Sequence, residues 1–373
     1  MNTPVRRLHN LRRALAAAGV DGLLVPRSDE YLGEYVAPSG ERLAWLSGFT
    51  GSAGLGIVTA TQAILFTDGR YTTQAAAQTD PALWELRHLI EEPPAEWLRR
   101  HAAGQRIGYD PSLISVAALR RLAGVELVPL PANPIDALWN DRPPLPAAAP
   151  FAHEGGEASA ERRQTLAAAL RQADEAACLL ADPHSVAWLL NLRGGDLAHT
   201  PLTLAQALLA ADGGVRLFLH APARVDAALR AHLGVEVAVG DRDALPAALA
   251  EFGGRKVRLD PEVTPARLAG LLRGAGAEVV EGDDPCRLPR ACKNAAERQG
   301  AREAHAKDAV AVARFLAWFA REAPGGALTE ITAAEALLGF RRAVPGFVAE
   351  SFPAISGAGE NGAIVHYRAA PGS

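Results

Sequence analysis

The C-terminal segment "NGAIVHYRAAPGS", residues 361–373, places one His and one Tyr after an apolar run. An imidazole exchanges its proton near neutral pH, so His366 is a candidate for acid–base or hydrogen-bonding chemistry. The apolar run Ala363, Ile364 and Val365 predicts that His366 lies on a buried strand. A lone His on a strand is more often structural, so the spacing alone favours a structural role.

The remaining sequence carries no sequence-local catalytic signature. It has no H-E-x-x-H, no G-x-S-x-G, no Walker A motif and no His/Cys cluster with the spacing of metal ligands. The Gly-rich segment 48–56, "GFTGSAGLG", lacks the Lys and the following helix of a phosphate loop, which favours a tight turn into a strand. We interpret Asp68 of "TDGRY" as a turn or helix N-cap residue, Arg70 as a possible interface group, and His184 as a helix-start residue.

Cysteine usage and charge limit the class of protein. Three cysteines, Cys178, Cys286 and Cys292, with no C-x-x-C spacing, predict small core residues in a reducing compartment. A net charge of -4 without clustered Lys or Arg argues against a nucleic-acid partner. The longest apolar run, 309–319, is broken by an Arg and is shorter than the roughly 18 residues of a membrane span. We therefore expect a soluble cytoplasmic protein.

Three stretches of the first half recur in the second half in the same order. "LRRALAAAGVDGLLVPRSD" from Leu11 resembles "LAAALRQADEAACLLADPHS" from Leu166, and "RLAWLSGFTGS" from Arg42 resembles "SVAWLLNLRGGD" from Ser185. A strand, an Asp-Pro turn, a helix and a second strand repeat as a whole in "RIGYDPSLISVAALRRLAGVELVPL" and "KVRLDPEVTPARLAGLLRGAGAEVVEG". The period of about 150 residues predicts two tandem α/β domains of like fold, each a mixed sheet covered by helices.

The segment from residue 289 onward has a different pattern. One long helix is predicted through "NAAERQGAREAHAKDAVAVARFLAWFAREAPGG", with His305 on its packing side as a partnered core residue. Thr332 with Glu335 predicts a capping box that opens a second helix ending near Arg342. The segment "FVAESFPAISGAGENGAIVHY" predicts two strands joined by a Gly/Asn turn. Because a lone hairpin does not complete a sheet core, we interpret this segment as the opening of a domain whose remainder is absent.

We place the domain boundaries near residues 135 and 289, because Pro and small residues concentrate between 129 and 150. The first domain is expected at 1–134, a linker at 135–157 and the second domain at 158–288. The third segment, 289–373, is expected to contain two helices and a hairpin.

Several separated motifs together carry a family resemblance. They are "SGFTGSAG", "TDGRY", "AWLLNLRGGD" followed by "HTPL", "CKNAAERQGAREAHAKDAVA", "GGALTEITAAEALLGFR" and "SFPAISGAGENGAIVHY". This combination resembles aminopeptidase P, the Xaa-Pro aminopeptidases of the creatinase/prolidase group. The resemblance implies two creatinase-like N-terminal domains followed by a pita-bread metallopeptidase domain. It also implies removal of the first residue from peptides with proline second, usually with two Mn²⁺ ions.

The resemblance gives substrate-side roles to two residues. His366 matches the His of the "IVHY" strand, which in relatives contacts the substrate and helps to stabilise the tetrahedral intermediate as a hydrogen-bond donor. Phe352 matches a position that is Tyr in some related enzymes; without a hydroxyl it would only line the pocket. The family's metal ligands, two Asp, one His and two Glu, begin beyond this strand. We therefore expect no bound Mn²⁺ and no turnover in this chain alone.

Three hypotheses of function follow. The first is that the chain is the N-terminal portion of an Xaa-Pro aminopeptidase. The second is a natural non-catalytic homologue that acts as a peptide-binding or dimerisation module. The third, an unrelated α/β nucleotide-binding protein, is disfavoured because no glycine-rich phosphate loop is present. By resemblance we expect a homodimer that binds peptides with proline at the second position, and neither a nucleic acid nor a membrane as a partner.

Overall fold

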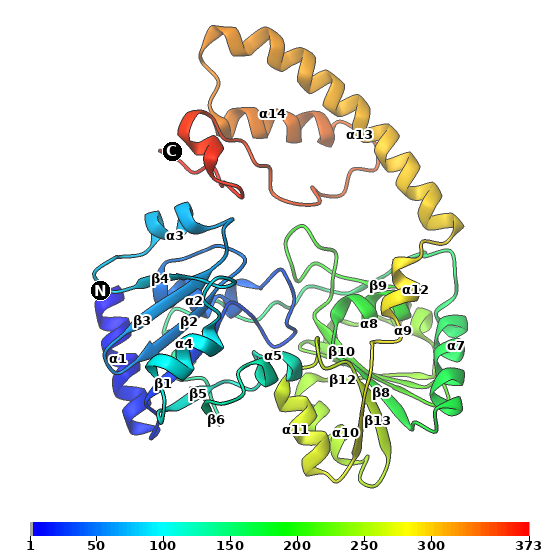
Figure 1. Cartoon of the computed structure of the whole chain (residues 1–373). Coiled ribbons are helices and arrows are strands. Elements are labelled where there is room, and N and C mark those ends of the chain that lie inside the picture. The colour runs from blue at the N-terminus through cyan, green and yellow to red at the C-terminus, as the bar shows by residue number, and fades with distance from the viewer. Residues whose placement is uncertain (1–2, 373) are drawn as a thin grey trace. The chain divides into compact units, whose positions relative to one another are not determined.

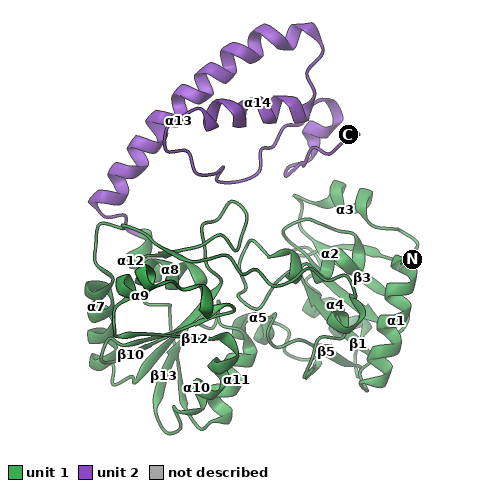
Figure 2. Cartoon of the chain, turned by 180° about the vertical axis from the view of Figure 1, so that it is seen from behind, with its two compact units in different colours: residues 1–291 green, residues 292–373 purple. Residues whose placement is uncertain are grey.

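The computed structural model describes residues 3–372 and divides into two compact units, 1–291 and 292–373. Figure 2 shows the first unit in green and the second in purple. Two α/β domains lie side by side within the first unit, whereas the second consists of helices and irregular chain (Figure 1). Among residues 3–372, no helix is long and apolar enough to cross a membrane.

The first domain is built on a six-stranded mixed sheet with the strand order β4-β3-β2-β1-β5-β6. Strand β1 pairs antiparallel with β2 and parallel with β5, and the outer pairs β3–β4 and β5–β6 are parallel. The strands are β1 (Gly22–Pro26), β2 (Leu55–Thr59), β3 (Ala63–Thr67), β4 (Glu85–His88), β5 (Arg106–Tyr109) and β6 (Glu126–Pro129). The helices are α1 (Pro4–Ala17), α2 (Arg42–Ser47), α3 (Thr72–Gln78), α4 (Pro94–His101), α5 (Val116–Arg121) and α6 (Pro134–Leu138).

The second domain repeats this topology in the order β12-β11-β10-β8-β13-β14. Here β8 takes the place of β1, because it pairs antiparallel with β10 and parallel with β13. Its strands are β8 (Ala177–Leu180), β10 (Ala205–Ala210), β11 (Val215–Leu219), β12 (Val237–Asp241), β13 (Lys256–Leu259) and β14 (Glu278–Glu281). Its helices are α7 (Ser159–Gln172), α8 (Pro183–Leu190), α9 (Ala227–Leu233), α10 (Leu245–Ala250), α11 (Ala266–Gly274) and α12 (Arg287–Ala291). The predicted duplication of an α/β fold is confirmed.

Both faces of each sheet are covered at its centre, which explains why inner strands such as β1, β3 and β8 are nearly continuous apolar runs, whereas the outer strands β4, β6 and β14 carry charged residues. In β1, Leu23 and Val25 pack with α1, α2 and α6 on one face, whereas Leu24 packs with Trp97 of α4 on the other. The second sheet alternates in the same way, with Cys178 and Leu180 in one core and Leu179 in the opposite core. Each domain is therefore a three-layer arrangement of helices, sheet and helices.

The Asp-Pro turns of the two repeats have matching local structure. Asp110 accepts a hydrogen bond from the amide of Ser112, and Asp260 accepts one from the amide of Glu262, each over 2.9 Å. The other carboxylate oxygen of Asp110 accepts from Asn133 Nδ2 over 3.1 Å, and that of Asp260 accepts from a backbone amide over 3.0 Å. Each aspartate thus closes its own Asp-Pro turn and ties that turn to a residue near the end of its domain, Asn133 or Asp284.

The same two turns join the domains to each other in a pseudo-twofold manner. The amide of Ala117 donates to Pro261 O over 2.9 Å, and in the mirrored pair the amide of Arg267 donates to Pro111 O over 2.8 Å. Likewise, Val116 N donates to Thr264 O over 3.1 Å and Ala266 N donates to Ile114 O over 2.9 Å. Each repeat therefore presents the same surface to the other, as the two halves of an isologous interface do. Figure 1 shows the result, with α5 and α11 adjacent.

The second unit contains the long helix α13 (Ala295–Glu322) and α14 (Glu330–Arg342). Asn294 caps α13 in a capping box with Glu297, and α14 packs along α13 through Trp318 and Phe340. The predicted helices are present, but the predicted box of Thr332 with Glu335 is wrong. The N-cap is Thr329, whose hydroxyl accepts from the amide of Thr332 while the Thr332 hydroxyl accepts from Thr329 N.

The predicted hairpin at the C-terminal end is also wrong. Residues 347–372 contain no strand; the short 3₁₀ helix η5 (Gly359–Ala363) occupies the middle of this segment. Strand-like alternation needs a neighbouring strand to satisfy its backbone, and a two-stranded hairpin without further strands is marginal. The segment instead folds back on α14 through side-chain hydrogen bonds.

Two predicted burial assignments also need correction. Cys178 and Cys286 are free and buried as expected, but the free thiol of Cys292 is exposed. His305 is exposed rather than a core residue: it borders the cavity next to residues 344–351, and Ala311 is the one buried residue of α13. The division of the chain after Ala291 lies next to the predicted boundary near 289; the boundary near 135 stays a prediction.

Candidate functional site

Both candidate site residues lie in the irregular C-terminal segment. His366 is half-buried in a turn, and Phe352 is exposed to 60% in a bend, so neither lies on the strand that the sequence predicted. Arg368 Nη1 donates to the carbonyl oxygen of Pro353 over 3.2 Å. Because these two residues are near neighbours of His366 and Phe352, the two stretches that carry the candidate residues lie side by side.

One carboxylate holds the segment that carries His366. Glu330, the first residue of α14, accepts from the amide of Ala358 at Oε1 over 2.6 Å and from the hydroxyl of Tyr367 at Oε2 over 2.6 Å. Asn361 Nδ2 donates to Glu330 Oε1 over 3.1 Å and to Tyr367 Oη over 3.0 Å. We call these four residues the Glu330 cluster. Sequence reasoning missed it, because Glu330 and Tyr367 are separated by 37 residues.

A second polar cluster in this unit holds a different part of the segment. Arg341 of α14 forms a bidentate ion pair with Asp308 of α13, from Nε to Oδ1 over 2.8 Å and from Nη2 to Oδ2 over 3.2 Å. Arg341 also forms an ion pair with Glu350. The hydrogen bonds from Arg341 lower the pKa of Asp308. These residues border a cavity of about 350 Å³ between α13 and residues 344–351. Neither His366 nor Phe352 lines that cavity.

The Gly-rich loop and the "TDGRY" motif meet in the first domain. Ser52 Oγ and Tyr71 Oη are 2.6 Å apart, and the rings of Phe49 and Tyr71 meet edge to face. Asp68 accepts from the amide of Arg70 over 3.0 Å and pairs with its guanidinium, which lowers the pKa of Asp68. Asp68 is thus a turn residue, as predicted, whereas the Gly-rich loop before β2 is irregular chain with a bend at Ser52 and Ala53 rather than the predicted tight turn. His184 stands in the first turn of α8 beside the N-cap residue Asp182, also as predicted.

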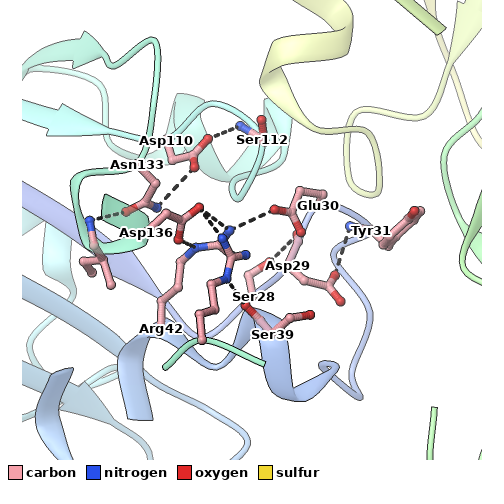
Figure 3. A network of polar contacts seen from close by, with 12 residues as sticks. Ser28, Asp29, Glu30, Tyr31, Ser39, Arg42, Asp110, Ser112, Asn133 and Asp136 are labelled. Carbon is pink, nitrogen blue, oxygen red and sulfur yellow. Dashed lines mark hydrogen bonds and ion pairs between the residues drawn. The ribbon is translucent and has the colours of Figure 1, made fainter. Parts of the chain in front are cut away.

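Figure 3 shows a buried ion-pair network in the same domain. Arg42 is 1% exposed, and its guanidinium donates to Asp136 from Nε over 2.7 Å and from Nη2 over 3.0 Å. It also donates to Glu30 over 2.9 Å, and Arg142 Nη1 lies 2.7 Å from Asp136 Oδ2, the oxygen that also accepts from Arg42 Nη2. The network joins α2, α6 and the loop after β1, so its position indicates a structural role.

The carboxyl groups next to Arg42 respond to burial differently. Burial raises the pKa of Asp29 to about 6, although the amide of Tyr31 donates to its carboxylate over 2.9 Å. Burial alone would raise the pKa of Glu30 as well, but the charge of Arg42 and the hydrogen bonds to the carboxylate together lower the pKa of Glu30. Burial also raises the pKa of Tyr31 to about 12.

The described residues do not provide a metal centre. Among residues 3–372, no group of three or more His, Cys, Asp or Glu side chains is arranged to hold a metal ion. The carboxylate of Glu330 is already committed to hydrogen bonds, and that of Asp308 is committed to Arg341. A dinuclear metal site therefore does not fit the side chains present.

Comparisons with known families match almost the whole chain. Residues 7–138 and, separately, residues 141–297 match the family Creatinase/Prolidase N-terminal domain, and residues 299–373 match Metallopeptidase family M24. The repeated match to one kind of domain agrees with the duplicated topology. The third match covers α13, α14 and the segment with both candidate residues.

Comparisons with individual proteins give the same assignment. The chain is 34% identical to a probable Xaa-Pro aminopeptidase P of Coccidioides posadasii, over 99% of this chain and 64% of that protein. A probable Xaa-Pro aminopeptidase P of Penicillium rubens is 31% identical over 98% of this chain and 63% of its own length. The crystal structure of a Caenorhabditis elegans X-prolyl aminopeptidase, described as a cytosolic enzyme with a di-nuclear active site, superposes with a TM-score of 0.91 at 29% identity. That match covers 99% of this chain and 64% of the nematode chain.

Proposed function

We propose that this chain, which belongs to the creatinase/prolidase group of M24 metallopeptidases, is the N-terminal portion of an Xaa-Pro aminopeptidase. The complete enzyme would be a dinuclear-metal hydrolase that removes the first residue of peptides with proline second. The observation that carries the proposal is the match along 99% of the chain to proteins of that name, at 34% identity for the fungal relative. The chain spans 64% of that relative's length, so the activity proposed is that of the whole protein.

The chemistry of the substrate explains what such an enzyme needs. A bond to proline is a tertiary amide, whose ring does not fit an ordinary peptidase pocket, so the site must position it and supply an activated water. Two metal ions would supply that water and polarise the scissile carbonyl when bound. Because the side chains present do not fit a metal pair, we propose that this chain alone binds no metal and is inactive.

His366 and Phe352 would form part of the substrate side. His366 would donate a hydrogen bond to the oxygen on which negative charge develops, which stabilises the transition state more than the ground state. Phe352, 60% exposed, would present an apolar ring to the substrate. The contact between Arg368 and Pro353 keeps these two stretches adjacent, which supports their participation in one site.

Metal identity, assembly and location follow from the family and remain part of the proposal. We propose Mn²⁺ as the metal pair of the complete enzyme, a homodimer as its assembly and the cytoplasm as its location. The nematode relative is described as a cytosolic enzyme with a di-nuclear active site. That description supports the proposed location and the proposed number of metal ions.

The proposal is tested on the protein that the gene produces in its own cells. The product is isolated, its intact mass is measured, and it is assayed with Ala-Pro-Ala and the matched control Ala-Ala-Ala. We expect a mass well above the 39.2 kDa of this chain and release of alanine from the proline peptide only. A mass above 39.2 kDa without cleavage of the proline peptide would contradict the proposal.

A second candidate function is that of a non-catalytic peptide-binding or dimerisation module. The first unit favours it, because both of its domains have closed hydrophobic cores. Both of its sheets have helices and buried cores on both faces, so this unit does not depend on a metal centre. A product of 39.2 kDa that binds an Xaa-Pro peptide without cleaving it would support this function over the first.

A further inference from the structure

One member of the Glu330 cluster, Tyr367, directly follows His366 in the chain. The cluster therefore bears on the position of the candidate site residue as well as on the loop. Tyr367 is 7% exposed, and its hydroxyl donates to Glu330 Oε2 over only 2.6 Å, a length typical of a charge-assisted bond. His366 itself lies in a turn without a strand ladder to fix its backbone. Tyr367 directly follows His366 in the chain, so the bonds that hold Tyr367 also limit how far the backbone of His366 can move.

Glu330 is well placed to hold that residue. It is the first residue of α14, where the helix macrodipole favours a negative charge, and the reciprocal bonds of Thr329 and Thr332 fix that helix end. Its two carboxylate oxygens accept from the amide of Ala358 and from the side chains of Asn361 and Tyr367. Both ends of the segment 358–367 are therefore bonded to the same side chain at the start of α14.

We propose that Glu330 is a positioning residue for His366, acting through Tyr367 and Asn361. This inference rests on the proposed function, in which His366 donates to the reacting oxygen. Loss of the carboxylate would leave His366 present but poorly aimed. An oxyanion donor that is misplaced by a fraction of an ångström loses much of its effect, so turnover would fall more than substrate binding.

The Asp308–Arg341 pair provides a matched control. Asp308 is also a carboxylate of this unit with a partner on α14, but that partner, Arg341, contacts Glu350 and not the turn that carries His366. A change at Asp308 therefore perturbs the packing of the unit without releasing the turn at 358–367.

Kinetics of the complete gene product give the first test. We expect Glu330→Gln to lower kcat for Ala-Pro-Ala by roughly 10- to 100-fold with KM changed by less than about threefold, whereas Asp308→Asn keeps kcat within about twofold. Tyr367→Phe should also lower kcat, and the double variant should be no worse than Glu330→Gln alone, since the Tyr367 hydroxyl acts through its bond to Glu330. A Glu330→Gln enzyme with wild-type kcat would overturn the inference.

A spectroscopic test on the 373-residue chain does not require activity. We expect Glu330→Gln to shift the ring proton resonances of His366 and to speed exchange of the Ala358 amide by about tenfold or more, as expected when a protecting bond is lost. Asp308→Asn should leave the His366 resonances and the exchange rate of the Ala358 amide unchanged. Tyr367→Phe replaces Glu330→Gln as the test variant if Glu330→Gln does not fold. Unchanged His366 resonances in both variants would overturn the inference. Inactivity of the complete wild-type product would instead refute the proposed function, so the two failures are distinguishable.

Discussion

Arg42 and Asp136 form a two-pronged ion pair across 94 residues of sequence, with N–O distances of 2.7 and 3.0 Å. The pair fastens α2 to α6, and Glu30 adds a contact from the loop after β1. A guanidinium that is 1% exposed depends on such partners, since an unpaired buried charge is costly.

Replacing Arg42 by methionine, which keeps most of the volume, should therefore destabilise the first unit. We expect a loss of about 2 to 3 kcal/mol in the free energy of unfolding, because Glu30 and Asp136 lose their main cation while each is still partly solvated. Arg100→Met removes an exposed pair with Glu96 and should cost less than about 0.5 kcal/mol. Urea titrations measure both values; equal losses would contradict the role assigned to Arg42.

Asp29 should make the first unit less stable as the pH rises. Its pKa is raised by burial from 3.8 to about 6 in the folded state, so the folded protein holds a proton that the unfolded chain releases. Stability from this group is present below about pH 4 and is lost as the pH rises to about 6. Relative to wild type, Asp29→Asn should gain about 1 kcal/mol between pH 5 and pH 8. A stability difference that stays constant between these pH values would argue against a raised pKa.

Gly48 and Gly270 should respond in opposite directions to alanine. Gly48 ends α2 at φ +87°, and a Cβ there would lie 2.8 Å from the carbonyl oxygen of Gln78. Gly48→Ala should cost at least about 2 kcal/mol through strain and contact. Gly270 lies inside α11 with open space around it, so Gly270→Ala should stabilise by about 0.5 to 1 kcal/mol. Thermal unfolding of both variants tests the pair, and a stable Gly48→Ala protein would contradict the conformation described.

The junction between the two domains can be weakened at one backbone group. Ala266 is the first residue of α11, a position that tolerates proline, and its amide donates to Ile114 O over 2.9 Å. Ala266→Pro should cost about 1 to 3 kcal/mol through the lost bond and crowding of that oxygen. Ser159→Pro, at the first position of α7, is the control and should change stability by less than about 0.5 kcal/mol. If both variants unfold at the same urea concentration, the junction contributes little.

Features with local causes were predictable from the sequence. The doubled α/β fold was found because each repeat carries the same strand, turn and helix signals, and α13 was found because of its length and apolar spacing. Asp68 and His184 were assigned correctly because turn and cap chemistry acts over two or three residues.

Features that depend on distant partners were not predictable. The prediction of a hairpin was wrong because a strand needs a neighbour that the local pattern does not specify. The prediction for His305 was wrong because apolar spacing along a helix does not show how much of that helix is covered. Arg42 was missed as a buried residue, since its partner lies 94 positions away. The candidate site rests on resemblance and stays a prediction, because nothing local distinguishes His366 from a structural His.

We propose that the chain supplies the substrate side of an Xaa-Pro aminopeptidase but not its metal ligands. The most direct test equilibrates the purified 373-residue chain and the complete gene product with Mn²⁺, removes unbound metal, and measures bound Mn²⁺ and Ala-Pro-Ala cleavage side by side. We predict two Mn²⁺ per chain and turnover for the complete product, and neither for the 373-residue chain. Stoichiometric Mn²⁺ with Mn²⁺-dependent cleavage by the 373-residue chain would contradict the account.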